Sequence, residues 1–275
     1  MTDGMEGLLE ALVRRSAPQE KPEDFRREGL LHCGSCRTPK QCRVFLGGQE
    51  RLVGCLCRCG QAQQEAEQAA RRRREHLDRV QALRQAGIAD AGLQDCRFET
   101  AAESPLIARC RRYVEHWPEA RRENLGMLLW GDTGGGKTFA AACVANALIE
   151  REVGALITSF PRILAAGFEE RRAFLRTLDH IPLLVLDDLG AERETEAALE
   201  LVYTVIDQRC KARLPLIVTT NLALKELQQP GDLRYLRIYA RVLEMCAPVL
   251  VRKESYRQRE AQRKLELART IFEGA

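Results

Sequence analysis

The chain has 275 residues, of which 45% are hydrophobic and 30% charged, which is room for one ordinary globular domain and a smaller module. A formal net charge of +4 is too small to indicate nucleic-acid binding by itself. No run approaches the roughly 18 apolar residues of a membrane span, and the N-terminus lacks the basic and then apolar pattern of a signal peptide. We therefore expect a soluble, cytoplasmic protein with no membrane partner.

The first sixty residues are predicted to form a module of their own. Residues 1–15 have the apolar spacing of a short amphipathic helix, and residues 16–22, with two prolines, are typical of a linker. Six of the eleven cysteines then fall between positions 33 and 59. Without a signal peptide, such a cluster indicates thiols or metal ligands rather than disulfides.

The spacing of these cysteines predicts a metal site. Cys33 and Cys36 form a C-x-x-C knuckle, in which two thiolates can bind one tetrahedral metal ion. The return pair comes about twenty residues later, as in zinc ribbons. We choose Cys57 and Cys59 for that pair, with Cys55 as the alternative.

Zinc is the expected metal, because a closed site of thiolates suits Zn²⁺, and an iron–sulfur cluster is the weaker alternative. Cys42 and His32 are candidates to replace one of the four chosen ligands. Residues 43–53 are predicted to be a β-hairpin around the pair Gly47-Gly48. Because so small a segment has almost no core, the metal would be its main source of stability.

Residues 61–85 are predicted to form a charged connecting helix. They are almost entirely Gln, Glu, Ala, Arg and Leu, and no Gly or Pro interrupts them before Gly87. The run Arg71–Arg74 could touch phosphates, although a run of like charges is more often a solvated helix face.

The strongest motif lies at residues 131–138, which read Gly-Asp-Thr-Gly-Gly-Gly-Lys-Thr and match G-x-x-x-x-G-K-[ST]. An apolar strand at 127–130 precedes the loop and a helix at 139–150 follows it. Lys137 would reach the β- and γ-phosphates, and the Thr138 hydroxyl would bind Mg²⁺. The predicted nucleotide-binding residues are Gly131, Asp132, Thr133, Gly134, Gly135, Gly136, Lys137, Thr138 and Phe139.

From about residue 88 the chain alternates between strand and helix patterns, which predicts an α/β fold with a mostly parallel sheet covered by helices. Further strands are predicted at 155–158, 181–188 and 214–221, and helices at 161–178 and 194–213.

Polar side chains end two of these strands. Asp187 and Asp188 close the apolar run 181–188, at the sheet edge where parallel sheets bind their ligands. Asp187 would hold Mg²⁺, and Asp188 would orient or deprotonate the attacking water. Asn221 ends the strand at 214–221 and could bind the γ-phosphate or that water, or else cap the next helix.

Three segments together resemble a known family: the loop at 131–138, Leu-Leu-Val-Leu-Asp-Asp-Leu-Gly-Ala-Glu at 183–192, and Val-Thr-Thr-Asn at 218–221. They are similar to AAA+ ATPases of the DnaC/DnaI helicase-loader type and to the related IstB-like ATPases, over roughly residues 90–265. The cysteine module resembles the zinc-binding N-terminal domain of DnaI-like and phage-type loaders. The resemblance implies an AAA+ ATPase domain with ATP and Mg²⁺ as cofactors.

The resemblance also implies further roles. Lys137, Asp188 and Asn221 would be catalytic, with Asn221 as the sensor-1 residue. The segment 234–243 matches the region that carries an arginine finger, for which we choose Arg241, with Arg237 close behind. Arg257, in Ser-Tyr-Arg at 255–257, would be a sensor-2 residue.

Binding of single-stranded DNA is the companion activity that the resemblance implies. Phe160 and Arg162 follow the strand at 155–158 and could stack on a base and contact a phosphate. A place for Phe160 in the core is at least as good an interpretation.

The combined motifs predict an ATP-dependent loader that delivers a hexameric replicative helicase onto single-stranded DNA and self-associates in its ATP form. ATP hydrolysis would be slow and dependent on assembly or DNA. The expected organisation is a helicase-binding zinc module at 1–60, a helical linker at 61–88 and an AAA+ domain at 89–275. The alternatives are an IstB-like ATPase assisting a transposase, and a zinc-containing ATP-binding DNA adaptor without turnover.

Overall fold

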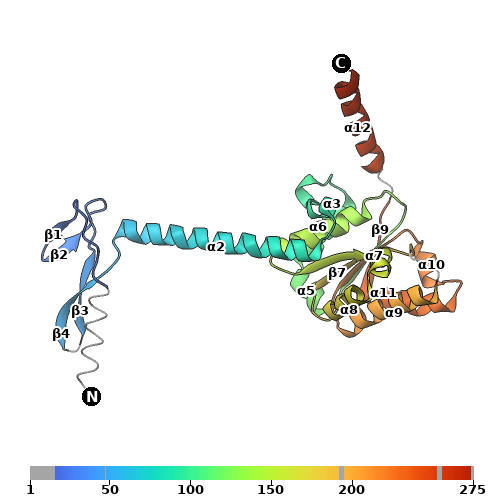
Figure 1. Cartoon of the computed structure of the whole chain (residues 1–275), viewed down its shortest axis with the longest axis horizontal. Helices are drawn as coiled ribbons and strands as arrows, with labels where there is room; N and C mark the ends of the chain where they lie inside the picture. The colour runs from blue at the N-terminus through green and yellow to red at the C-terminus, as the bar shows by residue number, and fades with distance from the viewer. Residues whose placement is uncertain (1–15, 47, 192–194, 253–255, 274–275) are drawn as a thin grey trace. The chain divides into compact units, whose positions relative to one another are not determined.

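The computed structural model describes residues 16–46, 48–191, 195–252 and 256–273, without the side chains of Leu46 and residues 256–263. The chain divides into two compact units, Met1–Leu77 and Asp78–Ala275. The helix predicted at 1–15 lies outside the described residues. Figure 1 labels the elements in chain order.

The N-terminal unit contains two small antiparallel sheets. Strands β1 (Phe25–Arg27) and β2 (Leu30–His32) form the first, and β3 (Gln41–Leu46) and β4 (Gln49–Gly54) form the second. The second pair confirms the hairpin expected around positions 47 and 48. Few side chains of this unit are buried, and these include Leu31, Cys33 and Cys57, so its core is very small.

The long helix α2 (Arg58–Gly87) begins in the cysteine region and contains the segment predicted to be helical. Arg71–Arg74 are exposed, and Arg71 pairs with Glu75 one turn later. The run therefore lies on an exposed helix face, and its contact with phosphates stays a prediction. Burial starts at Val80, which is 3% exposed.

The C-terminal unit is built on a five-stranded parallel sheet with the order β6-β7-β8-β5-β9. The strands are β6 (Ala155–Ser159), β7 (Leu183–Leu189), β8 (Leu216–Thr220), β5 (Gly126–Trp130) and β9 (Cys246–Leu250). The α/β expectation is confirmed, and four of these strands match predicted ones. The fifth strand, β9, was not predicted. Its sequence, Cys-Ala-Pro-Val-Leu, is apolar, but it is an edge strand with mostly exposed residues, and Pro248 within it argues against a strand in the sequence.

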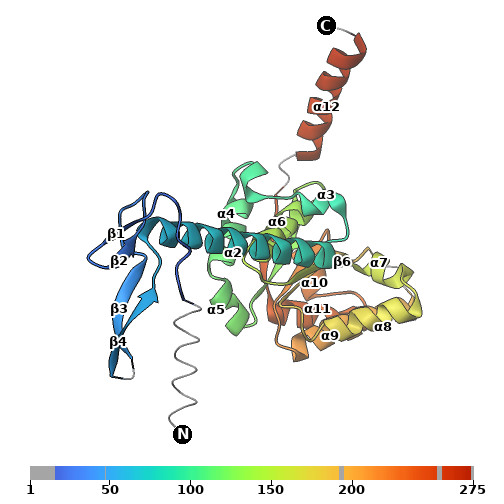
Figure 2. The same ribbon diagram turned by 60° about the vertical axis from the view of Figure 1, so that its left-hand side comes forward.

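Helices pack on both faces of this sheet (Figures 1 and 2). In β5, Met127 and Leu129 join the core under α6, while Leu128 joins the core under α9 and α11. A strand buried on both faces reads as a continuous apolar run, which is why the strands were visible in the sequence. The helices are α3 (Ala91–Gln94), the 3₁₀ turn η1 (Phe98–Thr100), α4 (Pro105–Glu115), α5 (Trp117–Arg122), α6 (Lys137–Glu150), α7 (Phe160–Ala165), α8 (Phe168–Thr177), α9 (Glu196–Lys211), α10 (Leu224–Gln228), α11 (Leu233–Met245) and α12 (Tyr256–Glu273).

The single helix predicted at 161–178 is wrong, because α7 ends at Ala165 and α8 begins at Phe168. Ala166 and Gly167 between them have extended backbone angles. Glycine is a poor helix former, and the Glu170 carboxylate accepts a hydrogen bond from the Gly167 N–H at 3.3 Å. This cap starts a new helix where the apolar pattern alone continues.

One buried arginine ties together the sheet edge opposite the predicted nucleotide site. Arg209 of α9 is 0% exposed. Its guanidinium donates to the carbonyls of Leu178, Ile181, Pro182 and Pro215 at 2.7 to 2.9 Å. Burial lowers its pKa to about 9. It thereby joins the residue that follows α8 to the segments entering β7 and β8.

We predict that Arg209→Met lowers the free energy of unfolding by roughly 3 kcal/mol or more, because four buried carbonyls lose their donors. Arg172→Met, at an exposed position of α8, should change it by no more than about 0.5 kcal/mol. Urea unfolding of the full chain followed by circular dichroism measures both. Equal stabilities of the two variants would contradict this role of Arg209.

Candidate nucleotide-binding and metal sites

The loop at 131–138 connects β5 to α6, as predicted, and its shape depends on glycine. Gly131 has a φ of 131°, and a Cβ built on it would lie 2.4 Å from the Val251 carbonyl oxygen. Any side chain there would therefore force the chain after β9 away. Gly136 is the left-handed N-cap of α6. The N-terminus of α6, with its free N–H groups, is thus placed to bind phosphate.

Lys137 is almost fully buried, at 5% exposed. Its ammonium donates to the carbonyls of Gly131 and Asp132 at 2.7 and 2.9 Å. It also donates to the Asn221 side-chain oxygen at 2.7 Å. The structure therefore brings together the loop lysine and the polar residue that follows β8. A buried ammonium that donates to these three oxygens is suited to bind phosphate oxygens in their place.

Asp187 links three elements through one carboxylate oxygen. The hydroxyls of Thr138 and Thr219 both donate to Asp187 Oδ1, at 2.9 and 2.6 Å. Thr138 belongs to α6, Thr219 to β8 and Asp187 to β7. An oxygen pair formed by a threonine and an aspartate fits the hard, oxygen-preferring Mg²⁺ ion.

Asp188 is directed differently from its neighbour by a local bulge. The register between β7 and β8 shifts between Leu186 and Leu189, and Asp188 has a φ of 55°. Its N–H donates to the Thr219 hydroxyl at 2.9 Å, which holds the backbone in this unfavourable region. As a result Asp188 lines the cleft together with Asn221.

A cleft of about 870 Å³ is lined by Lys137, Thr138, Asp188 and Asn221, and its volume is within the range of small-molecule sites. One side is the loop from Thr133 to Phe139. The other side comes from α3, η1 and the start of α4, a region that the sequence had not indicated as part of a site. The residues on that side are Gly92, Leu93, Asp95, Cys96, Thr100, Ala101, Ala102, Ser104, Leu106 and Ile107. This second side, which we call the cleft wall, is largely apolar and suits an aromatic base.

Two of the arginines chosen from the sequence, Arg237 and Arg241, do not line this cleft. Arg241 contacts Asp207 at 3.6 Å and Glu244 at 3.1 Å, so its charge is already paired within the chain. Arg237 is exposed and makes no ion pair within the described residues. Arg257 belongs to α12, but its side chain is outside the described part.

Phe160 is 0% exposed and belongs to the core beside Ile163 and Leu186. The suggestion that it stacks on a base is therefore wrong. Phe160 is the first residue of α7, directly after β6, and its ring belongs to the core between this helix and the sheet. Arg162 on the same helix is exposed.

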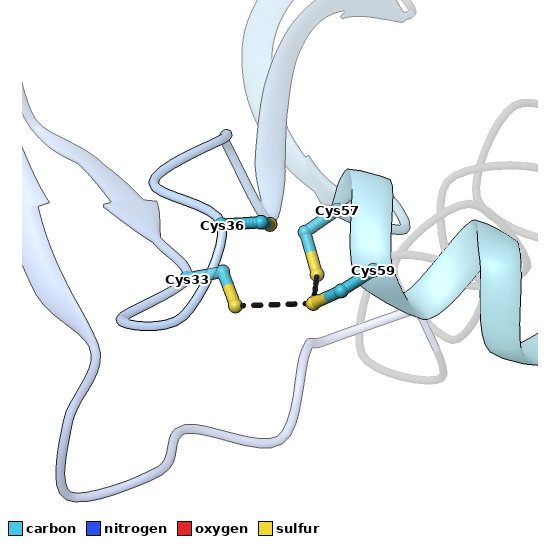
Figure 3. Close-up of side chains that lie close together, drawn as sticks. All are labelled: Cys33, Cys36, Cys57 and Cys59. Carbon is cyan, nitrogen blue, oxygen red and sulfur yellow. Dashed lines mark hydrogen bonds between the residues drawn. The ribbon is translucent and has the colours of Figure 1, made fainter.

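In the N-terminal unit, the four chosen cysteines come together. The sulfurs of Cys33, Cys36, Cys57 and Cys59 all lie within 4.8 Å of one another (Figure 3). Cys59 Sγ is 3.5 Å from Cys33 Sγ and 3.3 Å from Cys57 Sγ. Tetrahedral zinc with bonds of about 2.3 Å separates its sulfurs by about 3.8 Å, so the donor set fits the ion. Cys55 does not belong to this group.

The knuckle is held in shape by its neighbours. A Cβ on Gly34 would lie 2.2 Å from the Glu23 carbonyl oxygen, so only glycine fits there. The Gly34 N–H donates to Asp24, whose carboxylate also binds Lys40 at 2.6 Å. These contacts set the direction of the Cys33 and Cys36 side chains.

The thiols affect one another's ionisation. The Thr38 hydroxyl helps to lower the pKa of Cys36 to about 5, while the neighbouring sulfurs, Cys57 first, raise the pKa of Cys59 to about 12. Four thiolates so close together repel one another. A bound dication removes this repulsion, so this arrangement favours metal binding.

Comparison with known proteins agrees with this geometry. A family model described as IstB-like ATP binding protein matches residues 61–264, well over half of the chain. The chain belongs to the IstB-like ATP-binding family. This confirms the resemblance inferred from the three motifs.

Among individual relatives of this IstB-like protein, the replicative helicase loader DnaI of Bacillus subtilis is 29% identical over 150 residues, covering 48% of this chain and 47% of DnaI. The loader DnaC of Escherichia coli is 24% identical over 147 residues, covering 50% of this chain and 58% of DnaC. The chain thus spans about half the length of these loaders. The phage-like element PBSX protein XkdC of Bacillus subtilis is 26% identical over 266 residues, covering 90% of this chain and 92% of XkdC.

A crystal structure of DnaI has a similar fold to this IstB-like protein, with a TM-score of 0.52 and 22% identity. The match covers 60% of this chain and 96% of the solved one. The AAA+ expectation for the fold is confirmed. Within the described residues, no helix combines the length and apolar character needed to cross a membrane.

We predict that Cys59→Ser removes most of the zinc from the purified full-length protein, because a site with three thiolates binds the ion far more weakly. Cys55→Ser is the matched control, since Cys55 lies two residues before Cys57 and outside the cluster. Inductively coupled plasma mass spectrometry gives zinc per chain for both. If Cys55→Ser lost its zinc and Cys59→Ser kept it, Cys55 rather than Cys59 would be the fourth zinc ligand.

Proposed function

We propose that this protein is an ATP-dependent loader that binds a hexameric replicative helicase and delivers it onto single-stranded DNA. The observation that carries the proposal is the joining of three motifs in one cleft. Lys137 meets Asn221, and Thr138 meets Asp187. Among the relatives, DnaI and DnaC are both named as replicative helicase loaders.

The residues of the cleft have separate tasks in ATP binding and hydrolysis. Lys137 exchanges its oxygen partners for the β- and γ-phosphates of ATP. Thr138 and Asp187 would hold Mg²⁺, which when bound would supply positive charge beside the phosphates. Asp188, turned into the cleft, orients the attacking water. Asn221, already bonded to Lys137, senses the γ-phosphate.

In the N-terminal module, Cys33, Cys36, Cys57 and Cys59 hold Zn²⁺ as a structural cross-link. We assign helicase binding to residues 1–60, a linking role to 61–88 and ATP turnover to 89–275. The small core of this module makes its fold, and so its binding surface, dependent on the metal.

Self-association in the ATP form would supply an arginine to the γ-phosphate of a neighbouring copy. We now place Arg237 ahead of Arg241 for this task. Arg241 is neutralised by Asp207 and Glu244 within its own chain, whereas Arg237 is exposed on α11.

For single-stranded DNA we propose the exposed residues of α7 and α8. Arg162 is exposed, and Phe168 at the start of α8 is 76% exposed. Together they supply the cation and the aromatic ring that single strands require, which the buried Phe160 does not.

The second candidate is an ATPase that assists a transposase. A putative insertion sequence ATP-binding protein of Sinorhizobium fredii is 29% identical over 142 residues. The cysteine cluster favours the loader, because the resemblance of that module is to loaders.

Native mass spectrometry of the protein mixed with the replicative helicase of its host, with and without ATP, tests the proposal. We expect a discrete complex whose mass also includes the zinc. A chain that is folded, zinc-loaded and nucleotide-bound but makes no such complex would favour the transposase candidate.

We also predict that Arg237→Ala lowers ATP turnover in the assembled state by roughly a thousandfold or more, the scale expected for an arginine finger. Arg241→Ala should have a much smaller effect, since its charge is paired within the chain. Phosphate release at saturating ATP, with the helicase and DNA present, measures both variants. Normal turnover in Arg237→Ala would remove it from this role.

A further inference from the structure

Asn146 is a fully buried polar residue in the middle of α6, at 0% exposed. Its side-chain nitrogen donates to the carbonyls of Leu93 at 2.8 Å and Ala142 at 3.0 Å. Its side-chain oxygen accepts from Arg84 Nε at 3.2 Å. The amide nitrogen thus faces two carbonyl acceptors, and the amide oxygen faces one N–H donor. These partners determine which way round the amide lies.

These three bonds join elements that have different tasks. Leu93 belongs to α3 and forms part of the cleft wall. Asn146 lies on the same helix as Lys137 and Thr138. Arg84 lies one turn before the end of α2. The Asn146 amide is therefore shared by the wall, the phosphate helix and the end of α2.

The last ten residues of α2 are fixed firmly to this unit. Arg79 forms a two-point ion pair with Glu152, with both bonds at 2.8 Å. Arg84 also pairs with Glu150 at the end of α6. Ile88, just after the helix, bridges to Ile157 of β6. A bidentate pair and a buried bridge are the kinds of contact that hold a helix end in place.

The wall, by contrast, has little stability of its own. Helix α3 has four residues, which is too short to be stable without outside contacts. Its N-cap is Asp90, and its Leu93 carbonyl is held by Asn146. Gln94 adds a bond to the Ile88 carbonyl at 2.6 Å. The position of the wall therefore depends on Asn146 and on the chain that follows α2.

We propose that Asn146 and Arg84 are positioning residues that hold the cleft wall at the right distance from the phosphate loop, so that affinity for the base of the nucleotide depends on the end of α2. The proposal rests on the nucleotide site proposed above. Neither residue touches the phosphate loop itself, so the phosphate part of the site keeps its shape when they change.

The test uses two ligands, ATP and inorganic tripolyphosphate, each with Mg²⁺ and titrated calorimetrically into the full-length protein. In Arg84→Met we expect the Kd for ATP to rise about fivefold to tenfold, as for the loss of one hydrogen bond. The Kd for tripolyphosphate, which has no base, should stay unchanged. Asn146→Ala should show the same split.

Arg79→Met is the matched control. It removes a two-point ion pair from the same end of α2, and that pair is made with Glu152 rather than with Asn146 or the wall. The Arg79→Met variant should leave the Kd for ATP and the Kd for tripolyphosphate unchanged. Its melting temperature measures how much the loss of one α2 ion pair lowers the stability of the protein.

Three results would overturn the inference: an unchanged Kd for ATP in Arg84→Met, equal weakening of both ligands, or equal weakening of ATP binding in Arg79→Met. Because Arg84 keeps 19% of its side chain exposed and Asn146 is fully buried, the Arg84 variant keeps the test decisive even if Asn146→Ala does not fold. A wild-type protein that binds neither ligand would instead refute the nucleotide site, and this inference with it.

Discussion

The double hydrogen bond to Asp187 is the interaction on which the arrangement of the site depends. One carboxylate oxygen holds the hydroxyls of Thr138 and Thr219, and so joins the phosphate helix to β7 and β8. The bulge that follows turns Asp188 out of the strand and into the cleft. Adjacent acids in a regular strand would point to opposite faces, so the bulge gives each acid its own place at one edge.

The ends of the sheet differ in character. At the entry to β7 and β8, the Arg209 guanidinium donates to four carbonyls, and within the described residues it forms no ion pair. At the exit ends, polar side chains from the strands and the loop meet around Lys137. Between them the strands are apolar on both faces. The contacts that stabilise the sheet thus lie away from the edge around Lys137, which leaves that edge for the polar groups of the proposed nucleotide site.

Features determined by short-range spacing could be predicted from the sequence. The loop at 131–138, the acids after β7 and the cysteines all have fixed intervals that follow from the geometry of their ligands. The cleft wall and Asn146 could not, because their roles arise from contacts across 53 and 62 positions of the chain. Phe160 illustrates the same limit: an aromatic residue after a strand has the same sequence signal whether it is buried or exposed. The break at Gly167 depends on a single cap that apolar periodicity does not record.

We propose above all that ATP turnover in this cleft places a helicase on DNA. Unwinding of a short strand annealed to a covalently closed single-stranded circle tests it most directly, since a helicase ring cannot thread onto a circle from an end. The account predicts that the host helicase unwinds this substrate efficiently only with this protein and ATP, and that Asp188→Asn, which leaves Lys137 and Thr138 intact, blocks the productive step. Unwinding that is equally fast without the protein, or that Asp188→Asn supports as well as wild type does, would contradict it.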